Sequence, residues 1–176
     1  LGFLKDNESI YFQSEESGFS HLYTLNVLTK KKKQLTSGKW EVREVVLSKN
    51  KDFFFITANK NHLGNREFYK LNIQTTVLEP ILTEDGAVEV QISPDEKTLA
   101  VLYSFKNKPW ELYYSENKVN AKKVQITHST TKAFDAYQWK APEVIHFEGE
   151  DKTSLAARIY TPEEAKKNGA AVIFVH

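Results

Sequence analysis

Asn50-Lys51-Asp52-Phe53-Phe54-Phe55-Ile56 is a short polar turn followed by an apolar strand, and the chain contains this pairing three times. The counterparts place Ile10-Tyr11-Phe12 after Asp6 and Leu99-Ala100-Val101 after Asp95. The three Asx residues are 44 and 45 residues apart, and short polar side chains of this kind bond to nearby backbone and hold turns. A repeat in the forties is typical of β-propellers.

Each repeat continues with an aromatic strand and then a short exit strand that ends in Thr. The aromatic strands are Leu22-Tyr23-Thr24-Leu25, Phe68-Tyr69-Lys70-Leu71 and Leu112-Tyr113-Tyr114, and the exit strands are Gln34-Leu35-Thr36, Ile81-Leu82-Thr83 and Gln125-Ile126-Thr127. The next repeat opens with an alternating strand, Val42 to Leu47 or Val88 to Ile92. Four strands per repeat is the size of one propeller blade.

We therefore predict a mainly β fold that contains a partial β-propeller of about three four-stranded blades. An unrelated β-sandwich with similar strand spacing is the alternative. Because closed propellers typically have four to eight blades, three blades leave sheet edges and faces uncovered. We expect the chain on its own to be unstable or to associate with itself, which size-exclusion chromatography tests.

After Thr127 the blade pattern ends and a different organisation begins. Pro142 to Phe147 and Ser154 to Tyr160 are predicted to form a hairpin across the turn at Glu148-Gly149-Glu150-Asp151. Thr161-Pro162-Glu163-Glu164 has the form of a helix capping box, and Asn168-Gly169 supplies a helix stop.

The last stretch, Ala171-Val172-Ile173-Phe174-Val175-His176, is predicted to be a strand buried on both faces, as in the parallel sheet of an α/β domain. Hairpin, short helix and buried strand are the order in which an α/β-hydrolase domain begins. We predict the C-terminal blades of a propeller over residues 1–132 and the crossover and truncated start of an α/β-hydrolase domain over residues 133–176. Since residue 1 is Leu and Met is absent, we expect a piece of a longer protein.

Composition excludes several classes of function. Lys+Arg 24 against Asp+Glu 23 gives a formal charge of +1, which offers no general attraction to nucleic acid or to an anionic membrane. The absence of Cys excludes disulfides and thiolate metal sites, and we expect no cofactor. No apolar stretch is long enough for a transmembrane segment. The compartment, cytoplasmic or periplasmic in a bacterial-type host, stays undecided.

Four stretches resemble the prolyl oligopeptidase family of serine peptidases, and within it the dipeptidyl peptidase IV branch. They are Ser14-Glu15-Glu16-Ser17-Gly18-Phe19-Ser20-His21-Leu22-Tyr23, Leu35-Thr36-Ser37-Gly38-Lys39-Trp40-Glu41-Val42, Pro142-Glu143-Val144-Ile145 and Val172-Ile173-Phe174-Val175-His176. The first two are specific to the branch, and the last two are shared across the family. Together they span almost the whole chain.

The resemblance implies a parent enzyme in which a propeller limits access to a hydrolase domain that cleaves short peptides, as a post-proline dipeptidyl peptidase. It allows a homodimer of the parent. The nucleophile motif G-x-S-x-G occurs nowhere in the chain, so no Ser-Asp-His triad can be assembled, and we expect no catalytic residue and no activity here. His176 matches the position that marks the oxyanion region in relatives. A β-propeller scaffold that binds protein partners without catalysis is the alternative.

Several tempting patterns have a plainer interpretation. Glu15-Glu16 resembles the glutamate pair that grips a substrate's amino terminus in the branch, but it stands at a strand exit, so we interpret it as structural. Lys30-Lys31-Lys32-Lys33 is expected to be a solvated hairpin tip. The five His residues lack metal-site spacing. The aromatic residues are interpreted as blade packing, namely Trp40, Trp110, Trp139, Tyr23, Tyr69 and Tyr113.

Overall fold

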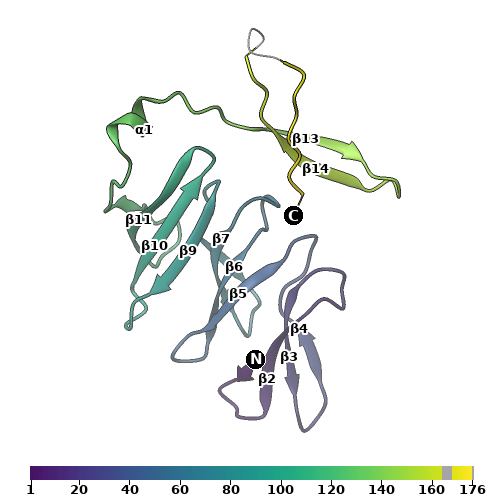
Figure 1. The fold of residues 1–176 in the computed structure, drawn as a ribbon. Helices are drawn as coiled ribbons and strands as arrows, with labels where there is room; N and C mark the ends of the chain where they lie inside the picture. Colours follow the sequence, from purple (N-terminus) through teal and green to yellow (C-terminus); the bar gives the residue numbers. More distant parts are fainter. Residues whose placement is uncertain (164–167, 176) are drawn as a thin grey trace. The chain divides into compact units, whose positions relative to one another are not determined.

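The computed structural model describes residues 1–163 and 168–175, and Figure 1 shows the course of the chain. The chain divides into two compact units, Leu1–Thr130 and Thr131–His176. The first unit carries the three β repeats. The second carries a short helix and a hairpin.

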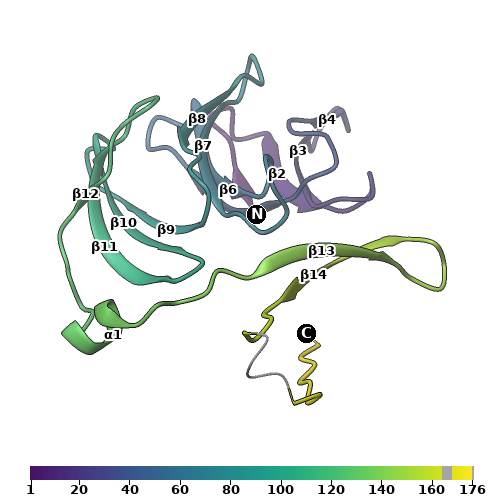
Figure 2. The same ribbon diagram turned by 90° about the horizontal axis from the view of Figure 1, so that it is seen from above.

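The first unit consists of three four-stranded antiparallel sheets, and in each sheet the strands are neighbours in chain order. Figure 2 shows the three sheets following one another along the chain. The first sheet contains β1 (Gly2–Phe3), β2 (Ser9–Ser14), β3 (His21–Asn26) and β4 (Lys32–Gln34). The second contains β5 (Val42–Leu47), β6 (Phe53–Ala58), β7 (Glu67–Asn72) and β8 (Leu78–Leu82). The third contains β9 (Ala87–Ile92), β10 (Thr98–Phe105), β11 (Lys108–Glu116) and β12 (Val124–Gln125).

The second sheet is packed on both of its faces. Phe54 and Ile56 of β6 lie in one apolar cluster with Leu22 of the first sheet. Phe55, between them in sequence, lies in another cluster with Val101 of the third sheet. Alternating side chains of one strand point to opposite faces, so β6 serves two interfaces. A two-sheet sandwich has no sheet of this kind, and the mainly β, blade-like arrangement predicted from the repeat is confirmed.

The turns before the second strands form as the repeat predicts. The Asp6 carboxylate accepts hydrogen bonds from Ser9 N at 2.8 Å and Ser9 Oγ at 2.6 Å. Asn50 Oδ1 accepts from Ser48 Oγ at 2.8 Å, and Asp95 Oδ1 accepts from Ser93 Oγ at 2.7 Å. All three side chains thus hold their own turns.

The exit strands end earlier than predicted. Leu35 and Thr36 follow β4, and Ile126 and Thr127 follow β12. The Thr side chains nevertheless bind the neighbouring strand: Leu22 N donates to Thr36 Oγ1 at 3.0 Å, and Leu112 N donates to Thr127 Oγ1 at 2.8 Å. In both places the Thr hydroxyl accepts the hydrogen bond that a backbone carbonyl would accept if the exit strand were longer.

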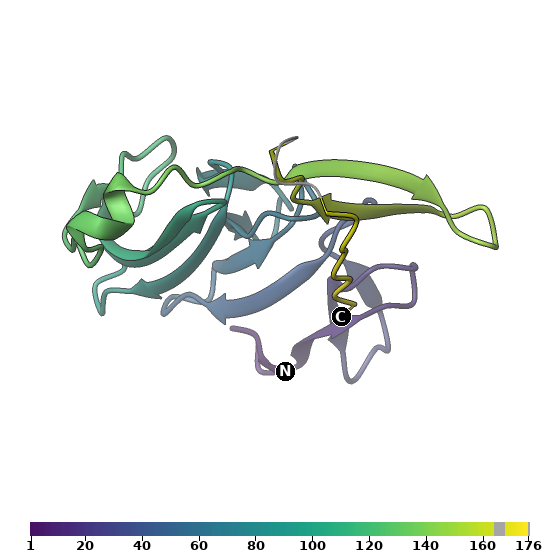
Figure 3. The ribbon, with the colours of Figure 1, turned by 45° about the horizontal axis from the view of Figure 1, so that its top comes forward.

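The second unit contains α1 (Lys132–Ala136) and the hairpin of β13 (Glu143–Glu148) and β14 (Ser154–Ile159), drawn in yellow-green in Figure 3. The hairpin confirms the prediction over 142–160. α1 was not predicted from the sequence; its N-cap Thr131 accepts a hydrogen bond from Phe134 N at 3.2 Å. The cap was readable from the sequence, since Thr is among the preferred N-cap residues.

One predicted element of the second unit lies mostly outside the described residues, and another differs from the structure. The short helix predicted between the cap at Thr161 and the stop at Asn168-Gly169 falls largely on residues 164–167, which lie outside the described residues. Residues 171–175 form no strand, and Val172 is 98% exposed. A strand exists through hydrogen bonds to a neighbour, and within the described residues this apolar segment has no paired strand.

The interpretation of the aromatic residues as blade packing is right for some and wrong for others. Trp40, Tyr23 and Tyr69 are buried, but Trp110 and Trp139 are 43% and 46% exposed. Trp110 alternates with the buried Glu111 of β11, so its ring lies on the other side of the strand. Trp139 belongs to the second unit, where it packs on Phe134 with ring centroids 4.7 Å apart.

No helix in the part of the chain that the structure describes is both long and apolar enough to cross a membrane.

Candidate functional site

The third strand of each sheet carries a buried polar side chain at the same position, two residues before the repeating tyrosine. These side chains are His21, Glu67 and Glu111, with exposed fractions of 1%, 0% and 6%. Buried polar groups need hydrogen-bond partners, so the surroundings of these three define the most organised polar chemistry of the blades. Sequence reasoning missed them, although their spacing follows that of Tyr23, Tyr69 and Tyr113.

His21 bridges two points of the segment that leaves the first sheet. Its Nδ1 lies 3.1 Å from Thr36 Oγ1, and its Nε2 lies 3.0 Å from the carbonyl oxygen of Gly38. Since Gly38 O can only accept, Nε2 carries the proton and Nδ1 accepts from the Thr36 hydroxyl. Trp40 meets the ring edge-on with centroids 5.0 Å apart. Both ring nitrogens are occupied, which leaves none for a substrate or a metal.

Glu67 collects donors from its own strand and from the loop before it. Tyr69 OH donates to the carboxylate, as do Asn61 N at 3.1 Å and Asn65 Nδ2 at 3.4 Å. Burial of the phenol, and then the hydrogen bond to Glu67, raises the pKa of Tyr69 far above its ordinary value. Tyr69 is therefore held as a neutral donor.

Glu111 collects its donors from the segment that leaves the third sheet. Thr127 Oγ1 donates to Oε2, and Ser129 donates to Oε1 through its N at 2.6 Å and its Oγ at 2.7 Å. The Thr127 hydroxyl first, and then the Ser129 hydroxyl and amide, lower the pKa of the Glu111 carboxyl. The carboxylate is thus ionised and fully engaged within the blade.

In these three arrangements the polar groups hold backbone and side chains of their own repeat. Each group spends its hydrogen-bonding capacity on its own sheet, and Tyr69 and Glu111 are shifted away from the pKa range of a group that exchanges protons near neutral pH. Among the described residues there is no group of three or more His, Cys, Asp or Glu side chains placed to hold a metal ion.

An apolar hollow of about 550 Å³ lies on the third sheet. Its lining is mostly apolar and aromatic, with Gln91, Ser93 and Thr98 as the other polar residues; the apolar and aromatic ones are Ile92, Pro94, Leu99, Ala100, Leu112, Tyr113, Tyr114 and Ile126. It contains no carboxylate, lysine, arginine or histidine, so it offers no acid or base to a ligand.

The profile of a family described as "Dipeptidyl peptidase IV (DPP IV) N-terminal region" matches residues 1–110, which include the first two sheets and most of the third. The chain belongs to this dipeptidyl peptidase IV N-terminal family. The fold resemblance extends further, because the crystal structure of Porphyromonas gingivalis dipeptidyl peptidase 4 superposes with a TM-score of 0.72 over 88% of this chain, at 18% sequence identity.

Individual relatives carry the same name. Dipeptidyl peptidase 4 of Trichophyton equinum is 27% identical over 138 residues, 77% of this chain, and that of Arthroderma otae is 29% identical over 139 residues. A probable dipeptidyl peptidase 4 of Aspergillus clavatus is 23% identical over 154 residues. The chain spans only 18% of the length of the first of these relatives and 22% of the P. gingivalis chain.

Within this dipeptidyl peptidase IV N-terminal region, Glu15 and Glu16 make contacts of a structural kind. Glu15 O accepts from Gly18 N at 2.8 Å in the turn, and Glu16 pairs with Lys32 at 2.7 Å across the first sheet. Both carboxylates lie on the surface. The ion pair of Glu16 agrees with the structural interpretation, and for the Glu15 carboxylate that interpretation stays a prediction.

The run Lys30 to Lys33 is exposed throughout, with Lys30 in the hairpin turn at a φ of 59°. Lys32 and Lys33 continue into β4, where Lys33 Nζ donates to Gln74 O at 3.1 Å. The run is therefore partly turn and partly edge strand, and the ammonium groups of Lys32 and Lys33 bind neighbouring acceptors.

Of the remaining predicted positions, His62 Nδ1 accepts from Gly64 N at 3.0 Å, which makes it a turn residue of the dipeptidyl peptidase IV N-terminal region. His146 pairs with Ala156 in the hairpin. His176 lies outside the described residues, so its role as a marker of the oxyanion region stays a prediction.

Proposed function

We propose that this chain is the propeller-to-hydrolase segment of a serine peptidase that releases dipeptides from short peptides, with a preference for cleavage after proline. The observation that carries the proposal is the family match over residues 1–110, supported by relatives named dipeptidyl peptidase 4 from several fungi.

In this proposal, residues 1–132 are the last blades of a propeller and residues 133–176 begin the hydrolase domain. The structure divides the chain close to that point, at Thr130, and the hairpin of β13 and β14 has the form expected of the first strands of such a domain. His176 would then stand at the entrance to the loop that stabilises the oxyanion.

The blades of this segment act as a rigid cap in the proposed enzyme and not as its chemical machinery. Their buried polar groups are saturated by backbone and side-chain partners, and both faces of the second sheet are packed. A cap of this kind restricts the size of the substrate that reaches a serine nucleophile supplied by another part of the protein. The 176 residues alone are expected to be inactive, because the chain contains no G-x-S-x-G motif.

The deciding experiment is hydrolysis of a Gly-Pro chromogenic amide by the full-length protein, together with labelling by a fluorophosphonate. We expect turnover and stoichiometric labelling of the full-length protein, and neither from residues 1–176. A full-length protein that is folded but neither hydrolyses the amide nor reacts with the fluorophosphonate would discard the peptidase proposal and favour the scaffold alternative.

A further inference from the structure

We propose that Glu111 is a positioning residue that clamps residues 127–129, the segment in which the chain leaves the third sheet. The proposal does not depend on peptidase activity. It concerns the joint at Thr130 and Thr131, where one compact unit ends and the next begins.

The clamp consists of one carboxylate and donors from two residues of the departing segment. Thr127 Oγ1 binds Oε2, and Ser129 binds Oε1 through both its amide and its hydroxyl, at 2.6 Å and 2.7 Å. Thr127 is itself tied to β11, since its Oγ1 accepts from Leu112 N at 2.8 Å. Hydrogen bonds to an ionised acceptor are about twice as strong as neutral ones. The departing segment is therefore held at Thr127 and again at Ser129, two residues later.

A buried polar side chain also binds the departing backbone at the exits of the other two sheets. At the first exit, His21 Nε2 donates to Gly38 O at 3.0 Å, and β5 of the second sheet begins at Val42. At the second exit, the buried Asn65 accepts from Gly86 N at 3.1 Å, and β9 begins one residue later. In both cases a buried polar side chain at or just before the third strand fixes the passage to the next sheet.

At the third exit the chain does not enter another sheet of the first unit. Ser129 is followed by Thr130 and then by Thr131, the N-cap of α1. Only one residue separates the clamped position from that cap. Glu111 thus fixes the backbone of the last segment of the first unit, up to Ser129, as His21 and Asn65 fix the segments that leave the other two sheets.

Hydrogen–deuterium exchange of the full-length protein tests the clamp. Glu111→Gln keeps the shape of the side chain but replaces one acceptor oxygen by an NH₂ donor that faces the donors of Thr127 or Ser129. Amide exchange in peptides covering residues 127–131 should become at least about tenfold faster, because a hydrogen bond to a charged group protects by about that factor or more. Peptides within β9 and β10 should exchange as before.

Glu116→Gln is the matched control. Glu116 lies on the same strand but its side chain is 57% exposed and pairs with Lys118 at the surface, so exchange at residues 127–131 should be unchanged. Equal acceleration in both variants, or no acceleration in Glu111→Gln, would overturn the proposal. Acceleration spread evenly over the third sheet would also overturn it, because Glu111 would then be a residue of general stability.

A second pair of variants keeps the test decisive if Glu111→Gln fails to fold. Thr127→Val removes the hydroxyl that binds Glu111, whereas Thr127→Ser retains it. Residues 127–131 should exchange faster in the Val variant and as in the wild type in the Ser variant. Equal acceleration in both would assign the anchoring to the methyl group and contradict the clamp.

Discussion

Replacing Gly38 by Ala should destabilise the first two sheets strongly. Gly38 has a φ of +129°, and a Cβ built on it would lie 2.4 Å from Nε1 and 2.6 Å from Cδ1 of Trp40. Trp40 is only 7% exposed, within the cluster between these sheets. The indole cannot give way without losing its contact with His21, whose Nε2 binds the Gly38 carbonyl.

The size of the effect follows from two costs. A residue with a side chain in this backbone region costs about 1–3 kcal/mol, and displacing a well-packed core side chain costs about 1–3 kcal/mol more. We expect a loss of about 2–6 kcal/mol in the free energy of unfolding, which is a large share of the about 5–15 kcal/mol that a domain typically possesses.

Gly18→Ala is the matched control. Gly18 also has a positive φ, +92°, but a Cβ there would meet nothing within 4 Å. In this variant the free energy of unfolding should fall only by the cost of a positive φ for a residue with a side chain, about 1–2 kcal/mol.

Urea unfolding measures both losses in a Trp110→Phe, Trp139→Phe background, in which Trp40 is the remaining tryptophan. Protein concentration must be held fixed and low, because association shifts apparent stability. In Gly38→Ala the emission of the native state should also move to the red as the indole becomes exposed. Equal losses in the two Gly variants with unchanged emission would refute the argument, since Trp40 would then not be seated against Gly38.

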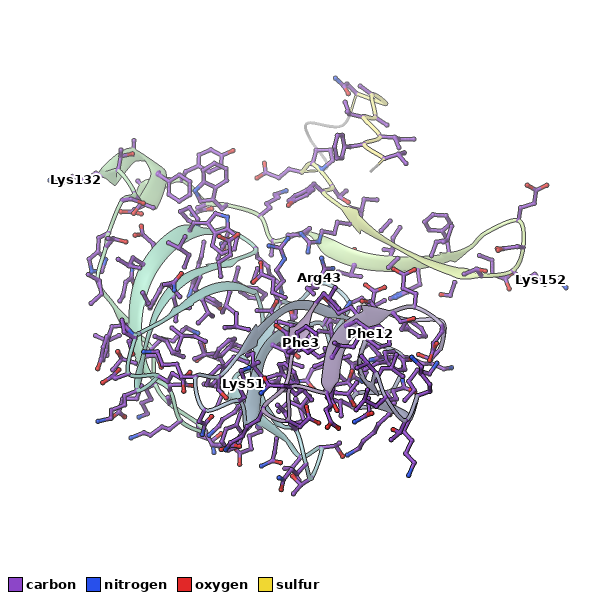
Figure 4. The ribbon with its side chains drawn as sticks, turned by 90° about the horizontal axis from the view of Figure 1, so that it is seen from below. Phe3, Phe12, Arg43, Lys51, Lys132 and Lys152 are labelled. Atoms are coloured by element: carbon purple, nitrogen blue, oxygen red, sulfur yellow. The ribbon has the colours of Figure 1, made fainter. Side chains whose placement is uncertain are left out.

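Three further variants test other contacts. Tyr69→Phe should lower the free energy of unfolding by about 1–3 kcal/mol, because the buried Glu67 carboxylate loses its phenol donor; an unchanged urea midpoint would contradict this. The Ser93 hydroxyl, and after it Lys97 N, holds the pKa of Asp95 below its ordinary value, so Asp95 contributes stability above its unfolded pKa and loses it as pH falls through the folded one. In Ser93→Ala an NMR titration should therefore show that the Asp95 pKa has risen toward the ordinary value, and no movement would mean that the hydroxyl does not bind. Lys152, at the tip of the hairpin (Figure 4), has a φ of 65°, so Lys152→Gly should slow amide exchange in the hairpin by relieving about 1 kcal/mol of strain; faster exchange would refute this.

The strands of the first unit could be predicted because they follow from local patterns repeated three times. Asp6, Asn50 and Asp95 each hold a turn with their own side chains, and a turn held by neighbours in sequence needs no tertiary information. The repeat thus predicted both the sheets and their order.

The polar groups that hold the exits could not be predicted in the same way. His21 and Glu111 differ in chemistry, and their partners Gly38 and Ser129 are 17 and 18 residues away. Those contacts exist only once the third strand and the exit segment lie side by side. A spacing shared with the repeating tyrosines was the available signal, but it does not reveal what a buried polar residue binds.

The errors in the second unit and at Trp110 have a related cause. Hydrophobicity indicates that a segment prefers to be buried, but burial requires a partner. Residues 171–175 and Trp110 have the composition of core residues, and the described residues leave them exposed. An apolar pattern in the sequence therefore predicts that a segment prefers burial more reliably than it predicts that the segment is buried.

The two-sided packing of the second sheet also bears on the order in which the first unit comes apart. Arrays whose units contact only their neighbours unravel from the ends, because a terminal unit loses one interface and an internal one loses two. Within residues 1–130, β6 has Phe54 in the cluster shared with the first sheet and Phe55 in the cluster shared with the third, so it should open only after one of these two interfaces has separated. The amides of β6 should therefore exchange more slowly than those of β4 and β12, the short strands that leave the first and third sheets.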